Sequence, residues 1–278
     1  MSIPLSILIL TKNEEPDLPG CLDSVAFSDD IHVFDSESTD RTAEIAHARG
    51  AHVTVRHFDG YAKQRNAAVQ LPFKYPWLLV LDADERPTPA LIAEIARTLP
   101  TTPDTTAAYR IRRRDFLWGT WLKHAQMSSF YVRLIRVGHV HYTRDVNEVA
   151  EITGDTAELT EPFDHLPFSK GLTHWVAKHN NYSTREAELL ANRDFIGDAS
   201  LRQAFFGADF HSRRIAQKAI FYQLPGRPII KWLYMMFLRG AILDGPAGIM
   251  YATLQSIYEY LIEIKCREIL RQRAGKTL

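Results

Sequence analysis

The chain has 278 residues, of which 46% are hydrophobic and 24% charged, and its 33 basic residues balance its 33 acidic ones. Such a composition is typical of folded globular proteins and excludes long disordered stretches. The two cysteines, Cys21 and Cys266, are too few for a disulfide scaffold or a cysteine-based zinc site, which favours a reducing compartment.

The first hundred residues alternate strand and helix patterns. Strands are expected at residues 5–10, 31–34, 52–55 and 77–81, and helices at residues 18–25, 39–49, 61–69 and 89–99. Repeated strand–helix units predict an α/β fold with a doubly wound, mostly parallel sheet. The β-rich segments between residues 108 and 152 are expected to extend this sheet, and helical patterns fill the chain after residue 171.

The charges and the apolar start of the chain add two expectations. Residues 1–100 contain 9 Lys/Arg and 15 Asp/Glu, a net of −6, whereas residues 201–240 contain 7 Lys/Arg and 1 Asp/Glu, a net of +6. We therefore expect these two regions to face different partners. The apolar residues 3–10 include Pro4 and follow no basic segment, so they predict a core strand better than a signal peptide.

The strand at residues 77–81 ends in the acidic sequence D-A-D-E, which contains Asp82 and Asp84. Parallel sheets bind ligands at the carboxyl ends of their strands. In an extended chain the two carboxylates would project to the same side and could share one divalent cation with a substrate phosphate. The alternative is a strand that ends in a solvated acidic turn, because so short a motif recurs by chance.

Two further polar clusters follow the first and second strands. T-K-N-E-E contains Thr11, Asn13 and Glu14, and D-S-E-S-T-D-R-T begins at Asp35. Clusters at the carboxyl ends of adjacent strands would form a crevice for a nucleotide. Asp35 could accept a hydrogen bond from the ring N–H of a uracil-type base, and Glu14 could bind ribose hydroxyls.

Other interpretations of these polar residues stay open. Ser38 or Asp40 would serve as the cap of the following helix, which would leave Asp35 available. In the segment K-Q-R-N, Lys63 or Arg65 could neutralise phosphate. Taken alone, these two cations would be solvated helix residues.

Taken together, the T-K-N-E-E, D-S-x-S-T-D-x-T, K-Q-R-N and D-A-D-E segments resemble the family 2 glycosyltransferases. The likeness covers most of the chain and is greatest for the bacterial subgroup that includes the lipopolysaccharide-core glucosyltransferases. It implies a GT-A fold in which the first clusters hold a nucleotide sugar and D-x-D holds Mg²⁺ or Mn²⁺. The implied nucleotide-sugar contacts are Thr11, Asn13, Glu14, Asp35, Lys63 and Asp82, and the implied metal ligands are Asp82 and Asp84.

The resemblance also implies a catalytic base. The family places a carboxylate in a V-H-E-like element, where this chain has Val146, Asn147 and Glu148; Asn replaces the common His. If residues 145–152 are extended, Glu148 shares a face with apolar side chains such as Ile152, and such a face raises the pKa of an acid toward the range of a base. A surface ion pair is the alternative role.

Two later segments carry further expectations. A histidine after the base serves as a third metal ligand in some related enzymes, so His165 is a candidate, although a lone histidine is more often structural. Residues 229–243 are apolar except for Lys231, Arg239 and Gly240, and fall short of the ~20 residues of a spanning helix. Their basic, aromatic surroundings predict a segment that lies on anionic lipid, with a buried core helix as the alternative.

We therefore expect a catalytic GT-A domain at residues 1–170 and a helical, acceptor- or membrane-associated region at residues 171–278. The expected activity is inverting, metal-dependent hexosyl transfer from a nucleoside-diphosphate sugar, with UDP preferred, to a lipid-linked or lipopolysaccharide acceptor. The expected location is the inner face of the bacterial cytoplasmic membrane, with no nucleic-acid partner. The alternatives are a non-catalytic membrane-binding homologue and a metal-dependent nucleotidyl or phosphoryl transferase, although no G-x-x-x-x-G-K-[ST] loop is present.

Overall fold

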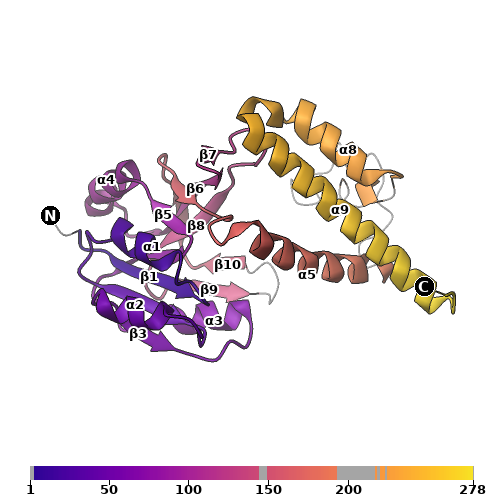
Figure 1. Cartoon of the computed structure of the whole chain (residues 1–278). Coiled ribbons are helices and arrows are strands. Elements are labelled where there is room, and N and C mark those ends of the chain that lie inside the picture. Colours follow the sequence, from indigo (N-terminus) through magenta and orange to yellow (C-terminus); the bar gives the residue numbers. More distant parts are fainter. Residues whose placement is uncertain (1–2, 144–148, 193–216, 218–219, 223, 278) are drawn as a thin grey trace. The chain divides into compact units, whose positions relative to one another are not determined.

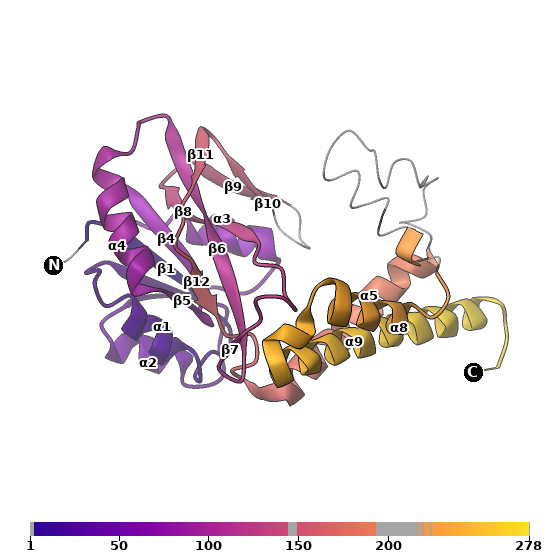
Figure 2. The ribbon, with the colours of Figure 1, turned by 90° about the horizontal axis from the view of Figure 1, so that it is seen from above.

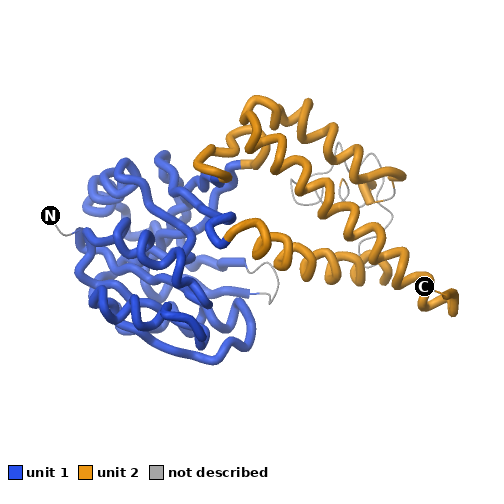
Figure 3. Tube along the Cα trace, viewed as in Figure 1, with its two compact units in different colours: residues 1–116, 128–170 blue, residues 117–127, 171–278 orange. Residues whose placement is uncertain are grey.

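The computed structural model describes residues 3–143, 149–192, 217, 220–222 and 224–277. The chain divides into two compact units (Figure 3). Unit 1 comprises Met1–Phe116 and Ser128–Lys170, and unit 2 comprises Leu117–Met127 and Gly171–Leu278. Each unit has its own arrangement of elements.

Unit 1 contains the predicted parallel sheet. Strands β1 (Ser6–Thr11), β2 (Ile31–Asp35), β3 (His52–Val55) and β4 (Trp77–Asp82) alternate with helices α1 (Leu18–Ser24), α2 (Thr42–Ala48), α3 (Tyr61–Ala68) and α4 (Pro89–Thr98), which a short turn η1 (Leu99–Thr101) follows. The strand order is β3-β2-β1-β4, and each neighbouring pair is parallel. The predicted elements are confirmed, because near-continuous apolar runs such as β4 are buried on both faces, as parallel strands require.

The β-rich region extends this sheet, as predicted. Strand β8 (Phe130–Arg136) lies antiparallel between β4 and β6 (Thr106–Leu117). Strand β12 (Phe163–His165) lies between β6 and the short β5 (Glu85–Pro87). A parallel strand, β11 (Asp155–Glu158), also pairs with β6, and β9 (Val140–Thr143) and β10 (Val149–Ile152) form a separate antiparallel ribbon.

Helices cover both faces of the sheet in unit 1 (Figures 1 and 2). On one face, Leu18 of α1 and Leu91 of α4 pack with strand residues such as Ile7 and Leu79 in one buried cluster. On the other face, α3 and β9 pack against Leu8 and against the other strand residues whose side chains point to this face. Together these residues form a second buried cluster. This two-layered cover leaves the carboxyl ends of the parallel strands as the edge where polar side chains gather.

Unit 2 is helical, with α5 (Gly171–Ala191), α8 (Arg227–Leu233), a π-helical turn η2 (Tyr234–Leu238), a 3₁₀ turn η3 (Ala241–Asp244) and α9 (Gly245–Arg273). Both α5 and α8 pack along α9. Gly248 permits a close approach within this unit, because a Cβ there would lie 2.0 Å from the Ala241 carbonyl oxygen. Among the described helices, none combines the length and the apolarity that crossing a bilayer requires.

Residues 117–127, which include β7 (Thr120–Trp121), join unit 2 although the sequence placed them within the first domain. The Asp244 carboxylate explains this, since it accepts hydrogen bonds from the backbone N–H groups of His124 (2.9 Å) and Ala125 (2.7 Å). Tyr251 of α9 donates a further hydrogen bond to the Gln126 side chain at 2.9 Å. The functional roles expected for residues 1–170 and 171–278 stay predictions.

Candidate active site

The loops after β1 and β2 are joined by side-chain hydrogen bonds. Asp35 is 1% exposed, and its carboxylate accepts from Thr11 Oγ1 at 2.7 Å, from the Ser38 N–H at 2.8 Å and from the Ser38 hydroxyl. Asp40 accepts from the Thr42 N–H at 3.0 Å at the start of α2, but the N-cap residue is Arg41, so neither Ser38 nor Asp40 occupies the cap position that we expected. Thr11 and Asp35 are thereby brought together, and their contacts with a nucleotide stay predictions.

Asn13 fixes the same pair of loops through its backbone conformation. Its φ is +54°, in the left-handed region that Asn tolerates better than most residues. The Asn13 side-chain oxygen accepts the Thr39 N–H at 2.8 Å, and its own N–H donates to the Ser38 hydroxyl at 2.8 Å. The Glu14 N–H donates to Thr42 Oγ1 at 2.8 Å. In this structure Asn13 therefore orders the loop that presents Glu14.

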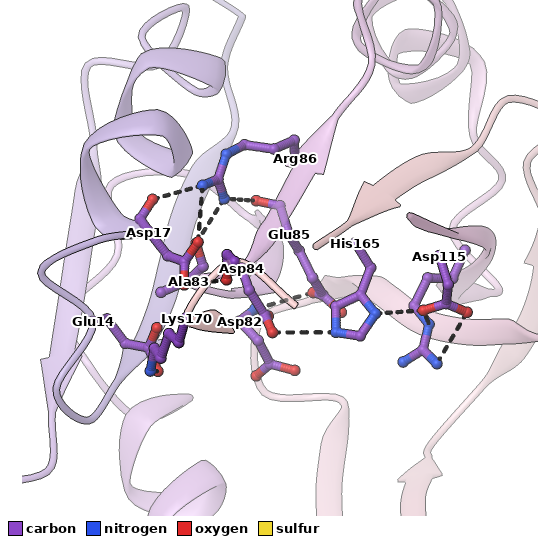
Figure 4. A network of polar contacts seen from close by, with 12 residues as sticks. Glu14, Asp17, Asp82, Ala83, Asp84, Glu85, Arg86, Asp115, His165 and Lys170 are labelled. Atoms are coloured by element: carbon purple, nitrogen blue, oxygen red, sulfur yellow. Dashed lines mark hydrogen bonds and ion pairs between the residues drawn. The ribbon is translucent and has the colours of Figure 1, made fainter. Parts of the chain in front are cut away.

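The D-x-D segment turns instead of continuing as a strand. Asp82 ends β4, whereas Ala83 and Asp84 form a turn before β5. The prediction of an extended chain through Asp82 and Asp84 is therefore wrong. Arg86 holds the turn, because its guanidinium donates to the carbonyl oxygens of Ala83 and Asp17 at 2.6 Å each (Figure 4). Asp82 and Asp84 consequently have different partners.

Asp82 belongs to a buried ion-pair network. Its two carboxylate oxygens accept from Arg65 at 3.0 Å and from Arg133 at 2.9 Å. Arg133 also pairs with Glu85, which is fully buried and accepts the Asp82 N–H at 3.0 Å. Burial alone would raise the pKa of Asp82, but the two guanidinium groups hold that pKa well below its usual range. Asp82 is therefore neutralised by two arginines from α3 and β8.

Asp84 instead faces His165. Strand β12 places His165 beside Asp115 of β6 and Glu85 of β5 in the register of the sheet. His165 Nε2 lies 3.2 Å from Asp84 Oδ2, its Nδ1 contacts Asp115 Oδ1, and the Leu166 N–H donates to the Asp84 carbonyl at 2.9 Å (Figure 4). Burial would lower the pKa of His165, but hydrogen bonds to Asp115 and Asp84 raise it to about 9.

Lys170 and Ser169 bring a second set of partners to the acids of the first loop. Lys170 Nζ contacts a Glu14 carboxylate oxygen, and Ser169 donates to the Asp17 carboxylate at 2.7 Å (Figure 4). Burial raises the pKa of Glu14 to about 7 even though Lys170 opposes this shift. Glu14, which we expected to bind ribose hydroxyls, thus has a cationic neighbour that the sequence did not identify.

The donor chemistry of Asp84 and His165 fits a divalent cation. Within the described residues, no three His, Cys, Asp or Glu side chains are grouped so that they could hold a metal ion. Mg²⁺ is commonly held by one or two protein ligands together with substrate phosphates. The 3.2 Å between His165 Nε2 and Asp84 Oδ2 is close to the separation of about 3 Å between neighbouring ligands of an octahedral ion with metal–ligand distances of ~2.1 Å. Of the three expected ligands, the structure pairs Asp84 with His165, while Asp82 contacts arginines.

Two of the expected site residues are not part of this network. Lys63 is exposed on α3, on a different face from Arg65, whose guanidinium reaches Asp82. Phosphate binding by Lys63 stays a prediction. Glu148, the expected base, lies outside the described residues, as do Val146 and Asn147. Its role therefore also stays a prediction.

Sequence reasoning missed several members of the network, among them Arg133 and Asp115, which are both buried. A signal for Asp115 exists, because it shares strand parity with Ile111 and Leu117, both of them buried in β6. A charged residue at such a position requires a partner. The identity of that partner depends on how β12 inserts beside β6, and this pairing is not encoded in local patterns.

The chain is similar to known proteins over most of its length. The profile described as "Glycosyl transferase family 2" matches residues 6–156. An uncharacterized glycosyltransferase of Rickettsia bellii is 37% identical over 277 residues, covering 96% of this chain and 87% of its own length. The lipopolysaccharide core biosynthesis glycosyltransferase LpsC of Rhizobium meliloti is 28% identical over 273 residues, covering 95% of this chain and 92% of its own length.

Among solved structures, a mannosyltransferase of Pyrobaculum calidifontis in complex with GDP-Man and Mn²⁺ aligns with a TM-score of 0.49 and 15% identity. The alignment covers 96% of this chain and 87% of that one.

Proposed function

The chain belongs to glycosyl transferase family 2, and on this premise we propose that it transfers a sugar from a nucleoside diphosphate, UDP by preference, to a lipid-linked or lipopolysaccharide acceptor. The observation that carries the proposal is the pairing of Asp84 with His165 directly after β4. Such a pair offers cation ligands at the edge where parallel sheets bind nucleotides. The likeness to LpsC over most of both chains supports a lipopolysaccharide acceptor.

The proposed roles follow from the chemistry of each side chain. Asp84 and His165 hold Mg²⁺ or Mn²⁺, with Asp82 as the further acid of the motif. A bound cation offsets the charge that develops on the departing diphosphate. The nucleotide sugar is bound by Thr11, Asn13, Glu14, Asp35, Lys63 and Asp82.

Glu148 is proposed as the base. It takes the proton of the acceptor hydroxyl while that oxygen bonds to the anomeric carbon and the bond from this carbon to the diphosphate breaks, which inverts the configuration. The proposal for Glu148 rests on the sequence, through its place in the V-N-E segment.

We further propose that unit 2 docks on an anionic membrane surface, at the inner face of the cytoplasmic membrane. Along α8, η2 and η3 many large apolar side chains are exposed, including Leu238 at 82% and Leu243 at 72%, whereas Met235 and Met236 of η2 are buried. Contiguous exposed apolar side chains of this kind mark interaction surfaces. Of the described cations in the same stretch, Arg239 is partly exposed and suits an anionic headgroup, whereas Arg227 is buried and burial lowers the pKa of Lys231. Arg213, Arg214 and Lys218, which contribute to the positive charge of this region, lie outside the described residues.

A panel of sugar nucleotides tests the proposed activity. The full chain is incubated with UDP-, GDP-, dTDP- and CMP-sugars plus a lipopolysaccharide acceptor extract, with Mn²⁺ or with chelator, and nucleotide release is measured. We expect turnover with a UDP-sugar and Mn²⁺. No turnover with any donor would favour a non-catalytic membrane-binding homologue, and release of pyrophosphate or phosphate instead of nucleoside diphosphate would favour nucleotidyl or phosphoryl transfer.

Asp84→Asn tests the metal site with a matched control. Calorimetry should show that Mn²⁺ strengthens UDP binding to the wild type but not to Asp84→Asn, because the amide removes the charge that attracts the cation. Asp155→Asn is the control, since Asp155 is exposed and lies at the opposite end of β6 from Asp115. Equal UDP affinity of the wild type with Mn²⁺ and with chelator would contradict the metal site.

A further inference from the structure

Asp115 is a buried acid of unit 1 that none of the proposed roles uses. It is 4% exposed and lies near the carboxyl end of β6, where β12 pairs alongside in parallel. The register places His165 directly opposite Asp115. Figure 4 shows Asp84, His165 and Asp115 in a line, with the imidazole between the two carboxylates. The pairing of strands β6 and β12, rather than a flexible loop, therefore fixes the distance between Asp115 and His165.

The two imidazole nitrogens face different groups. Nδ1 contacts the Asp115 carboxylate, whereas Nε2 faces Asp84 Oδ2 at 3.2 Å. Arg113 also forms an ion pair with Asp115, because its Nε lies 3.1 Å from Asp115 Oδ1. A buried carboxylate that holds the proton on Nδ1 means that a cation binding at Nε2 displaces the Nε2 proton to solvent, which leaves the tautomer that a cation ligand needs.

We propose that Asp115 is a positioning residue that orients His165 and fixes its tautomer, so that Nε2 binds the divalent cation together with Asp84. This inference rests on the proposed metal-dependent function. Histidine ligands almost always donate their second ring N–H to a carboxylate, carbonyl or water, and loss of that partner typically weakens metal binding by about 10–100-fold. Asp115 touches neither cation nor substrate and acts only through His165.

The neighbouring acid Asp164 provides a matched control. It precedes His165 on β12, and its carboxylate pairs with Arg114 at 2.6 Å. Asp115 and Asp164 thus each pair with an arginine of β6, but only Asp115 contacts the imidazole. Asp164→Asn removes an equivalent charge without changing the support of His165.

Mn²⁺ binding to the full chain in the presence of UDP gives the decisive readout. Free Mn²⁺ is counted by electron paramagnetic resonance, and pulsed measurements detect nitrogen coupling from a bound imidazole. Asp115→Asn should weaken Mn²⁺ binding by about 10–100-fold and reduce the nitrogen coupling. Asp164→Asn should leave both unchanged, and His165→Ala should abolish the coupling. Asp115→Glu keeps the carboxylate and should restore part of the affinity.

A measurement on the wild-type protein covers the case in which Asp115→Asn does not fold. Proton–nitrogen correlation spectra of the Mg²⁺- and UDP-bound chain, labelled at histidine nitrogen, should show His165 with its proton on Nδ1. A proton on Nε2, or Mn²⁺ affinity and nitrogen coupling unchanged in a folded Asp115→Asn variant, overturns the proposal. Nitrogen-coupled Mn²⁺ in a wild type that transfers no sugar would refute the proposed function but not the role of Asp115.

Discussion

The two units differ in which side chains they bury and which they expose. Unit 1 buries its apolar residues on both faces of a sheet and gathers charged side chains at the strand ends, where Arg133 and Glu85 are buried together with Asp115. Unit 2 leaves large apolar side chains such as Phe237 and Leu238 exposed on its described turns. The difference indicates that unit 1 is built to hold charges in fixed positions, whereas the described turns of unit 2 leave apolar surface exposed, as interaction surfaces do.

The largest effect is expected in the chemistry assigned to unit 1. Glu148→Gln keeps the side-chain volume and its hydrogen-bonding capacity but cannot take a proton, so sugar transfer should fall by about 10²–10⁴. Donor affinity, measured by calorimetry, should stay within a few-fold of the wild type. Near-normal transfer would remove Glu148 as the base and point to Asp145 or Glu151. Loss of donor binding together with folding would assign Glu148 to the support of the pocket.

The next effect tests the buried ion pairs of unit 1. Arg133→Met leaves Glu85 and Asp82 without their shared cation, and breaking a buried pair from one side typically costs about 3–5 kcal/mol. Urea unfolding should show this loss. The double variant Arg133→Met/Glu85→Gln should recover part of it, because the buried charge left behind is also removed. A single variant as stable as the wild type would mean that the network contributes little to stability.

A smaller effect is expected at the exposed surface of unit 2. The double variant Leu238→Glu/Leu243→Glu should bind anionic vesicles about tenfold more weakly or worse, because burying each leucine contributes roughly 1.5–3 kcal/mol when complete. Its folding stability should change little, since both side chains are exposed. Leu270→Glu, near the end of α9, is the control at another exposed leucine. Unchanged co-sedimentation of the double variant at low salt would exclude this face as the docking surface.

The smallest effect concerns the pH dependence of unit 1. The pKa of Glu14 is raised by burial to about 7 in the folded chain, against an ordinary value of 4.5. The folded state therefore prefers protonated Glu14: its contribution to stability is complete below pH 4.5 and is lost as the pH rises through about 7. Because the side chain is partly open to solvent, we expect a loss on the order of 1 kcal/mol relative to Glu14→Gln. This is checked by measuring the melting temperatures of the wild type and of Glu14→Gln at several pH values between 5 and 8. Melting temperatures that change equally with pH in both proteins would contradict the prediction.

Local patterns sufficed to predict the parallel half of the sheet. Each strand there is a short, nearly continuous apolar run followed by polar residues. The end of a helix is also marked in the sequence, as by Gly50 after α2. The predicted β3 at His52–Val55 has the observed bounds. These features depend on residues close in sequence, which is why periodicity and turn chemistry identify them.

The partners of the D-x-D acids could not be predicted in the same way. The turn at Ala83 breaks the alternation that an extended chain would have, and the partners of Asp82 and Asp84 come from β8, α3 and β12. Those contacts depend on strand order and register over separations of 17 to 81 residues along the chain. Family resemblance pointed to His165, but no local signal identified Arg133.

Strand β12 also determines when the Asp84–His165 pair can assemble during synthesis. It is inserted between β5 and β6, and it carries His165 to Asp84 while Leu166 anchors the turn backbone. A ribosome-bound chain that ends before residue 163 leaves the facing edges of β5 and β6 unpaired and lacks the imidazole. Pairing across such a separation closes a long loop and is a late folding event. The nascent protein therefore has no assembled Asp84–His165 pair until most of its length has been translated and β12 has been inserted into the sheet.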